Sequence, residues 1–198
     1  MSGMTKMLTG LALFLASIFL ALGQVHGQAN SCLDPDGADY KCVSGTTSLY
    51  LYDCGIGDAD HAALSTCLDD AGRAEITVLY LYDNDLTTLP EGIFSGLTAL
   101  TNIYLYDNDL TTLPEGIFSG LTALQYLDLS GNSLTTLPKG IFSGLTALQA
   151  LSLDGNDLTT LPAEVFRGLT TLDYLYLDGN DLTTLPAEVF SGLTILDY

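Results

Sequence analysis

The stretch Leu100–Ala123 reads LTNIYLYDNDLTTLPEGIFSGLTA, and nearly the same 24 residues occur five times in succession. The other four copies begin at Ile76, Leu124, Leu148 and Leu172. A unit of this size is too small to bury its own apolar side chains, so each copy must pack against its neighbours. The repeats, which cover residues 76–195, therefore predict an elongated stack of coils around one shared core.

The first half of each repeat alternates like a strand with one buried face. Ile103 and Leu105 alternate with Tyr104 and Tyr106, so the first pair is expected to point into the core and the second toward solvent. An asparagine follows where the chain turns away, and its buried amide can bond to backbone groups that the turn leaves unpaired. It occurs as Asn84, Asn108, Asn132, Asn156 and Asn180.

The second half of each repeat carries a proline, as at Pro114, which disfavours a regular helix just before it. We therefore expect polyproline-like or short 3₁₀ segments opposite the strands rather than long α-helices. One slot in this half is always phenylalanine, which predicts a continuous spine of packed rings. These rings are Phe94, Phe118, Phe142, Phe166 and Phe190.

Together these elements resemble the typical 24-residue class of leucine-rich repeat, as in Toll-like receptor ectodomains, variable lymphocyte receptors and small extracellular proteoglycans. The resemblance covers residues 76–195 through the L-x-x-L-x-L strand motif, the asparagine, LTTLP, and GIF or EVF. It implies an α/β repeat solenoid, curved, with a parallel β-sheet on its concave face and short irregular or 3₁₀ segments on its convex face. It also implies that the protein binds another molecule.

Residues 46–75 form a variant repeat. The sequence LYLYDCGI at 49–56 matches LYLYDNDL at 79–86, thirty residues later. The following DADHAALSTCLDDAG predicts a helix with Asp58 or Asp60 as its cap and with Ala63, Leu64 and Leu68 on its apolar face. This unit resembles the longer, helix-bearing repeats of ribonuclease-inhibitor-like proteins, where cysteine often replaces the asparagine.

The first 27 residues are interpreted as a cleaved secretory signal. Lys6 precedes an apolar run from Leu8 to Leu22, which is shorter than the ~20 residues needed to span a bilayer. The alternative is an uncleaved N-terminal anchor. We therefore predict a secreted or extracellular-surface protein with no membrane span in this chain.

Four cysteines precede the regular repeats: Cys32, Cys42, Cys54 and Cys67. In a secreted chain they suggest two disulfides with three alternative pairings. We favour Cys32–Cys42 and Cys54–Cys67 because both close short loops, with the first stapling an N-terminal cap at residues 28–45. Their spacing is not that of a zinc site, and we predict neither a metal nor a cofactor.

The chain is strongly acidic, with a formal net charge of −19. Nucleic acid is excluded as a partner because phosphate binding needs clustered Lys and Arg. A cationic protein, a metal ion or a neutral glycan suits the field better. The alternative is that the acidity only keeps an elongated protein soluble.

The strand positions predicted to face solvent hold most of the tyrosines and several aspartates. Aromatic side chains provide contact area at low entropic cost, and carboxylates can bond to sugar hydroxyls or to basic side chains. We predict that this concave face binds a protein or a glycan; the alternatives are a tyrosine ladder that only stiffens the sheet and simple copying of one repeat. The candidate residues are Tyr50, Tyr52, Tyr80, Tyr82, Tyr104, Tyr106, Tyr126, Tyr174, Tyr176, Asp83 and Asp107.

Other functions have less support in the sequence. The repeated threonine pairs, such as Thr111-Thr112, suggest ice binding, and the aspartate rows suggest calcium. No set of catalytic residues is recognisable, so we predict that the protein is not an enzyme. Residues 196–198 begin a sixth, incomplete repeat, which suggests either a fragment of a longer receptor or self-association through this uncapped end. A scaffold or matrix role without a specific ligand remains the alternative function.

Overall fold

The computed structural model describes residues 47–196. The predicted signal peptide, the cap at 28–45 and the last two residues lie outside this range, as do Cys32 and Cys42. Neither Cys54 nor Cys67, the two cysteines within the range, is a free thiol. The pairing of the four cysteines stays a prediction.

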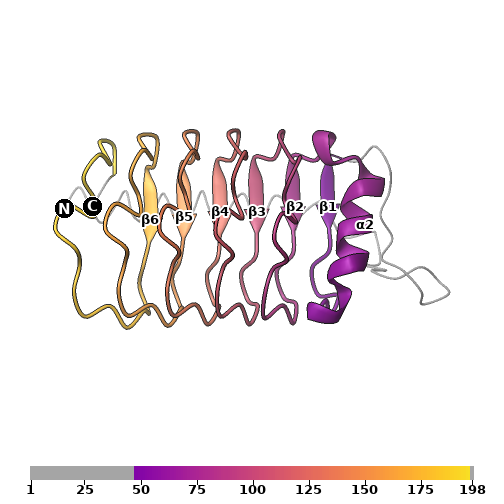
Figure 1. The fold of residues 1–198 in the computed structure, drawn as a ribbon, viewed down its shortest axis with the longest axis horizontal. Helices are drawn as coiled ribbons and strands as arrows, with labels where there is room; N and C mark the ends of the chain where they lie inside the picture. The colour runs from indigo at the N-terminus through magenta and orange to yellow at the C-terminus, as the bar shows by residue number, and fades with distance from the viewer. Residues whose placement is uncertain (1–46, 197–198) are drawn as a thin grey trace, which may run out of the picture. The chain divides into compact units, whose positions relative to one another are not determined.

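One short strand from each coil joins a parallel six-stranded sheet, in which the strands follow their order in the sequence (Figure 1). The register pairs Leu49 with Leu79, Leu79 with Ile103, and so on along the sheet. The predicted fold class is thus confirmed, and the segment at 46–75 takes its place as the first coil. The strands are β1 (Ser48–Tyr50), β2 (Val78–Tyr80), β3 (Asn102–Tyr104), β4 (Tyr126–Asp128), β5 (Ala150–Ser152) and β6 (Tyr174–Tyr176).

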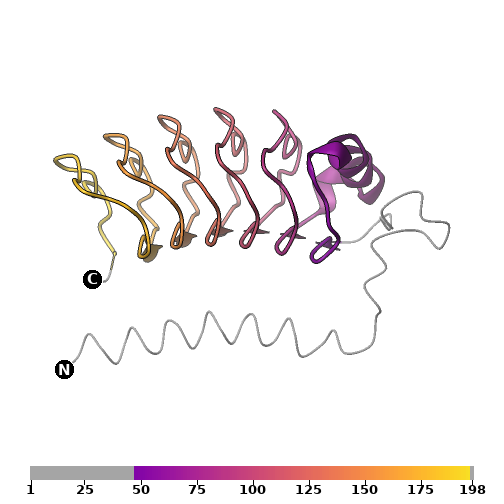
Figure 2. The same ribbon diagram turned by 90° about the horizontal axis from the view of Figure 1, so that it is seen from below.

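The side opposite the sheet is made of consecutive tight turns. In the coil of β3, the Ile117 amide donates to the Pro114 carbonyl at 3.3 Å and the Ser119 amide to the Gly116 carbonyl at 2.8 Å. This three-residue spacing is that of 3₁₀ turns, as the proline predicts. The coils lie closer together along the sheet than along the turns, so the sheet face is concave (Figure 2).

The space between the sheet and the turns is filled by leucines and by the phenylalanine spine. Consecutive ring centroids from Phe94 to Phe190 are 6.0 to 6.3 Å apart, and each pair of rings is stacked. The first four rings have no exposed surface, whereas Phe190 on the last described coil is half-buried. The predicted aromatic spine is confirmed.

The asparagine of each coil binds the backbone of two coils at once. Asn108 Nδ2 donates to the carbonyl of Leu105 in its own coil and, at 2.9 Å, to that of Leu81 in the preceding coil. Its Oδ1 accepts from the Leu86 amide of the preceding coil at 3.2 Å. Asn84, Asn108, Asn132 and Asn156 are buried, whereas Asn180 on the last described coil is half-buried. These side chains bond to the unpaired groups of the turn, as predicted.

Replacing Asn108 by alanine should lower the free energy of unfolding by about 2–3 kcal/mol, because it leaves buried backbone donors and acceptors without partners. Urea denaturation followed by circular dichroism measures this loss. Thr111→Ala, an exposed change in the same coil, is the control and should cost less than about 0.5 kcal/mol. Equal effects for the two variants would show that the asparagine bonds contribute nothing.

A helix covers the first coil. The 3₁₀ turn η1 (Asp58–Asp60) leads into α2 (His61–Ala71), and η2 (Arg73–Glu75) follows. Leu64 and Leu68 are fully buried, as predicted, but Ala63 is only half-buried. Asp60 stands at the N-cap position but makes no side-chain cap bond, because its carboxylate accepts from the Gly57 amide instead.

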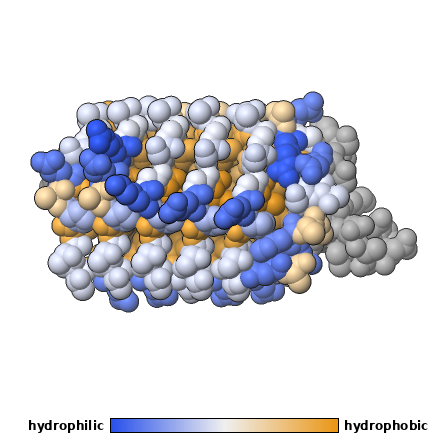
Figure 3. Space-filling model, in the orientation of Figure 1, coloured by the Kyte–Doolittle hydropathy of each residue, from blue (hydrophilic) through white to orange (hydrophobic). Residues whose placement is uncertain are grey.

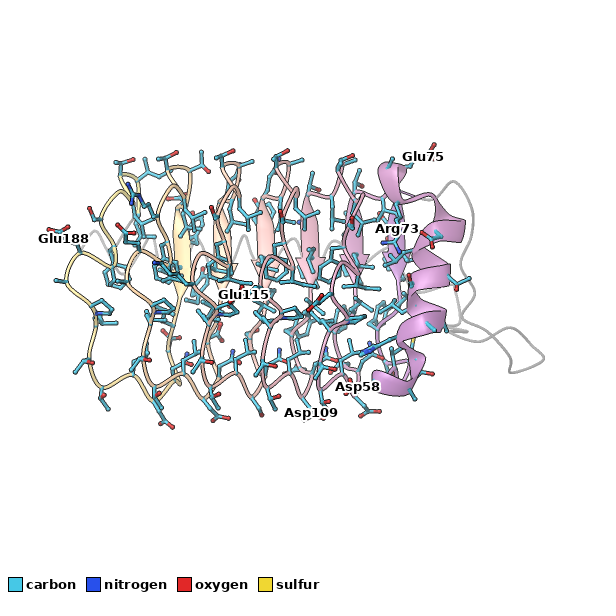
Figure 4. The ribbon with its side chains drawn as sticks, viewed as in Figure 1. Asp58, Arg73, Glu75, Asp109, Glu115 and Glu188 are labelled. Atoms are coloured by element: carbon cyan, nitrogen blue, oxygen red, sulfur yellow. The ribbon has the colours of Figure 1, made fainter. Side chains whose placement is uncertain are left out.

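Arg73 connects α2 to the coil of β2 through hydrogen bonds. Its guanidinium donates to Asp69 on the helix and, at 2.6 Å, to the carbonyl of Ile93 in the coil of β2 (Figure 4). No helix within residues 47–196 has the length and apolar character needed to cross a membrane.

Candidate binding surface

Six tyrosines form a compact block on the sheet face of the first three coils. Parallel strands lie about 4.8 Å apart, and residues in register repeat at that spacing, so identical rings can stack face to face. The first ladder comprises Tyr50, Tyr80 and Tyr104, with ring centroids 4.8 and 4.9 Å apart. The second ladder comprises Tyr52, Tyr82 and Tyr106, with ring centroids 4.6 and 4.4 Å apart.

The two ladders also touch each other. Tyr80 and Tyr82 meet edge to face, with centroids 6.2 Å apart and an interplanar angle of 84°. Within each ladder, the middle ring (Tyr80 or Tyr82) is stacked on both faces. Ring edges and hydroxyl groups, rather than the faces of these middle rings, are what the block offers to a ligand.

The other three predicted tyrosines lie on the sheet but outside the block. Tyr126 is on β4, and Tyr174 and Tyr176 are on β6. The strand between them, β5, carries the small residues Ala150 and Ser152. All nine predicted tyrosines thus lie on the sheet face, but the structure divides them into groups.

A row of exposed aspartates borders the second ladder. Asp53, Asp83 and Asp107 all have φ of 52 to 53°, in the left-handed region that non-glycine residues seldom adopt. Burial raises the pKa of Asp83, and the flanking Asp107 and Asp53 carboxylates raise it further. In the next three coils the same position holds Gly131, Gly155 and Gly179, with φ of 59 to 64°.

The tyrosine ladders end at β4, where the residues next in register are Asp128 and Ser130. Asp128 is only 5% exposed, and its Oδ1 accepts from the Ser130 amide at 3.0 Å and from the Ser130 hydroxyl at 2.6 Å. Burial raises the pKa of Asp128; the Ser130 bonds lower it, and Asp154 and Asp107 raise it. Asp128 is not among the residues predicted from the sequence, although an ionisable residue in register with a tyrosine ladder was a visible signal.

Charge is distributed unevenly over the described residues. Their three Lys and Arg residues all lie outside the strands. Arg73 is in η2, directly after the helix α2, and Lys139 and Arg167 are on the turns opposite the sheet. On the face opposite the sheet, weakly polar residues alternate with hydrophobic surface visible between them, and a row of hydrophilic residues crosses it (Figure 3). Glu115 and Glu188 belong to that face (Figure 4). Within residues 47–196 the sheet face, in contrast, carries carboxylates without Lys or Arg.

The free energy of unfolding should fall at alkaline pH because the hydroxyl groups of the tyrosine ladders lose their protons. Burial, with neighbouring tyrosines, raises the pKa of Tyr80 and Tyr82 to about 12, from 10.0 in the unfolded chain. The unfolded chain therefore loses these protons first, so their contribution is complete below pH 10 and is lost as the pH rises through 12. Urea denaturation at stepped pH measures the decline. A variant with both tyrosines changed to phenylalanine should lose less stability over this range; an unchanged decline would refute the assignment.

A family model for the leucine rich repeat matches residues 74–134, 98–158, 131–182 and 148–198, more than half of the chain. The chain is a leucine-rich-repeat protein. A search of curated proteins found no match to it. Leucine-rich repeats typically mediate protein binding on a scaffold that is not an enzyme. No group of three or more His, Cys, Asp or Glu residues within 47–196 is arranged to hold a metal ion.

Proposed function

We propose that this leucine-rich-repeat protein is a secreted recognition module that binds another molecule through the tyrosine block and its aspartate border. The observation that carries the proposal is the pair of three-ring ladders on a concave face, beside a row of exposed carboxylates. A protein is the better-supported ligand, because stacking already occupies both faces of the middle rings, which a sugar ring would need. A glycan can still stack on the outer rings, such as Tyr50, which is 49% exposed.

Three features of the block support recognition. Tyrosine edges and hydroxyls provide apolar contact and hydrogen bonding together, and tyrosine is enriched at interfaces. Asp53, Asp83 and Asp107 have the positive φ that glycine has at the same position in the following coils. Because glycine would satisfy this backbone conformation, the aspartate carboxylates point to a role beyond the turn. Like charges in a row also oppose folding, which a bound partner of opposite charge would relieve.

The proposal is tested by probing an array of secreted proteins and glycans with the full-length mature chain. A saturable protein hit that the Tyr82→Ala, Tyr106→Ala double variant loses supports it. Hits that this variant retains would place binding elsewhere and overturn the proposal.

A scaffold role through self-association is the second candidate. Leu185 and Ile195, on the last described coil, are 50% and 51% exposed, which suits contact between copies. Light scattering at increasing concentration separates the two functions. Growing polymers support the scaffold, whereas a monomer at all concentrations supports recognition.

A further inference from the structure

Each tyrosine ladder ends before β4, so its last ring has a stacked tyrosine on one face only among the described residues. Tyr104 and Tyr106 each stack on one ring only among the described residues, Tyr80 and Tyr82 respectively. The next residues in register, Asp128 and Ser130, are not aromatic and are shorter. Between β3 and β4 the side chains on the sheet face therefore change from large rings to small residues, and we call this change in height the step.

Carboxylates gather at this step. The Asp107 carboxylate occupies the space over Gly131 that a Cβ there would need, so it leans from the coil of β3 toward that of β4. Asp154, one coil further on, accepts a hydrogen bond from Ser152 and raises the pKa of Asp128. Asp107 likewise raises the pKa of Asp128, so both neighbouring carboxylates act on the residue that follows Tyr104 in register.

Asp128 is incompletely satisfied within the protein. Both of its hydrogen bonds from described residues reach Oδ1, and none of those residues donates to Oδ2. Buried polar atoms nearly always have a partner, and an unpaired carboxylate oxygen is costly. An atom of this kind, at the base of an aromatic step, points to a donor from outside the chain.

We propose that the step between Tyr104, Tyr106 and Asp128 binds an arginine side chain of the protein partner. The planar guanidinium can stack on the last ring of a ladder, Tyr104 or Tyr106, while its N–H groups donate to the neighbouring carboxylates. Asp128 Oδ2 and the Asp107 carboxylate are the acceptors. This inference rests on the proposed function, and it adds the chemistry of the side chain that the surface recognises.

Arginine fits the step better than lysine for two reasons. A guanidinium is more weakly hydrated than an ammonium, so it more readily approaches the carboxylate of Asp128, a residue that is 5% exposed. Its flat shape also matches the ring spacing that the ladder sets, taking the place that a fourth ring would occupy. The absence of Lys and Arg from the sheet face of the described residues leaves the site without a competing cation of its own.

The test uses Nα-acetyl-arginine amide as the probe, titrated into the full-length mature chain carrying ¹³C-labelled tyrosine and observed by NMR. We expect saturable shifts of the Tyr104 and Tyr106 signals with a Kd of about 1–10 mM. The neutral isostere Nα-acetyl-citrulline amide should cause no saturable shift. The proposal would be overturned by equal shifts with both probes or by a lack of saturation with the arginine amide. Tighter binding of a third probe, Nα-acetyl-lysine amide, would also overturn it.

Variants locate the site. Asp128→Asn and Asp107→Asn should each weaken arginine binding about tenfold, whereas Glu115→Gln, which removes the same charge from the opposite face, should leave it unchanged. Thermal melting checks the fold, and Asp128→Asn should melt no lower than the wild type because it removes a buried charge. Binding that survives in both aspartate variants refutes the site.

The failure of this inference can be told apart from failure of the proposed function. If an array partner loses affinity in the Tyr82→Ala, Tyr106→Ala variant but not in Asp128→Asn, the block binds partners without the arginine site. If no array partner depends on the tyrosines, the proposed function fails, whatever the amide probe does.

Discussion

Phe118→Ala is expected to lower the free energy of unfolding by about 3–5 kcal/mol, the largest loss that we expect from a single substitution in this chain. The ring has no exposed surface and stacks between Phe94 and Phe142, at centroid distances of 6.0 and 6.3 Å. Removing it leaves a cavity between two coils, each of which depends on its neighbour for burial. Urea denaturation followed by circular dichroism measures the loss.

The spine supplies its own control. Phe190 occupies the same slot but is half-buried, and among the described residues it has a ring partner on one side only, Phe166. Phe190→Ala should therefore cost less than half as much as Phe118→Ala. Equal losses at the two positions would contradict the view that stacking between coils stabilises this protein.

The Tyr82→Ala, Tyr106→Ala double variant is expected to weaken partner binding about 1,000-fold, as the loss of two hot-spot residues of about 2 kcal/mol each would do. Both side chains belong to the second ladder, next to the aspartate row. Truncating both removes the centre of the proposed surface. Cross-strand pairs of this kind contribute roughly 0.2–1 kcal/mol each, so the variant should remain folded.

Calorimetry against the strongest array partner measures the affinity, and thermal melting measures the fold. Tyr174→Ala is the matched control, because Tyr174 is an exposed tyrosine of the same sheet, on β6 outside the block. It should bind as the wild type does. If the double variant melts far below the wild type, the ladders brace the sheet and the recognition hypothesis loses its support.

The repeat period and the alternation of residues were enough to predict the architecture. A strict spacing of 24 residues brings Ile103 beside Leu79 and Leu127, and this fixes the register of the sheet. Alternation decides which side chains are buried, and the asparagine supplies the missing backbone partners. The thirty-residue offset of LYLYDCGI likewise predicted that β1 pairs with β2 in register.

The chemistry of the candidate site was less predictable, because it depends on contacts between coils. The sequence placed Tyr80 and Tyr82 on the surface but did not show that stacking uses both of their faces. It gave Asp128 no special weight, since its burial arises from neighbours on adjacent strands. Asp58 or Asp60 was expected to cap the helix, yet neither does so through its side chain. The Asp60 carboxylate accepts from the Gly57 amide, and the Asp58 carboxylate accepts from the Thr87 and Thr88 amides of the next coil.

The most direct test of the concave tyrosine surface is an NMR comparison of the free and partner-bound chain, with ¹³C-labelled tyrosine and threonine. We expect the signals of Tyr80, Tyr82, Tyr104 and Tyr106 to shift on binding. Those of the exposed threonines Thr111 and Thr122, outside the strands, should stay in place. Shifts confined to such threonines, with the four tyrosine signals unmoved, would contradict this expectation.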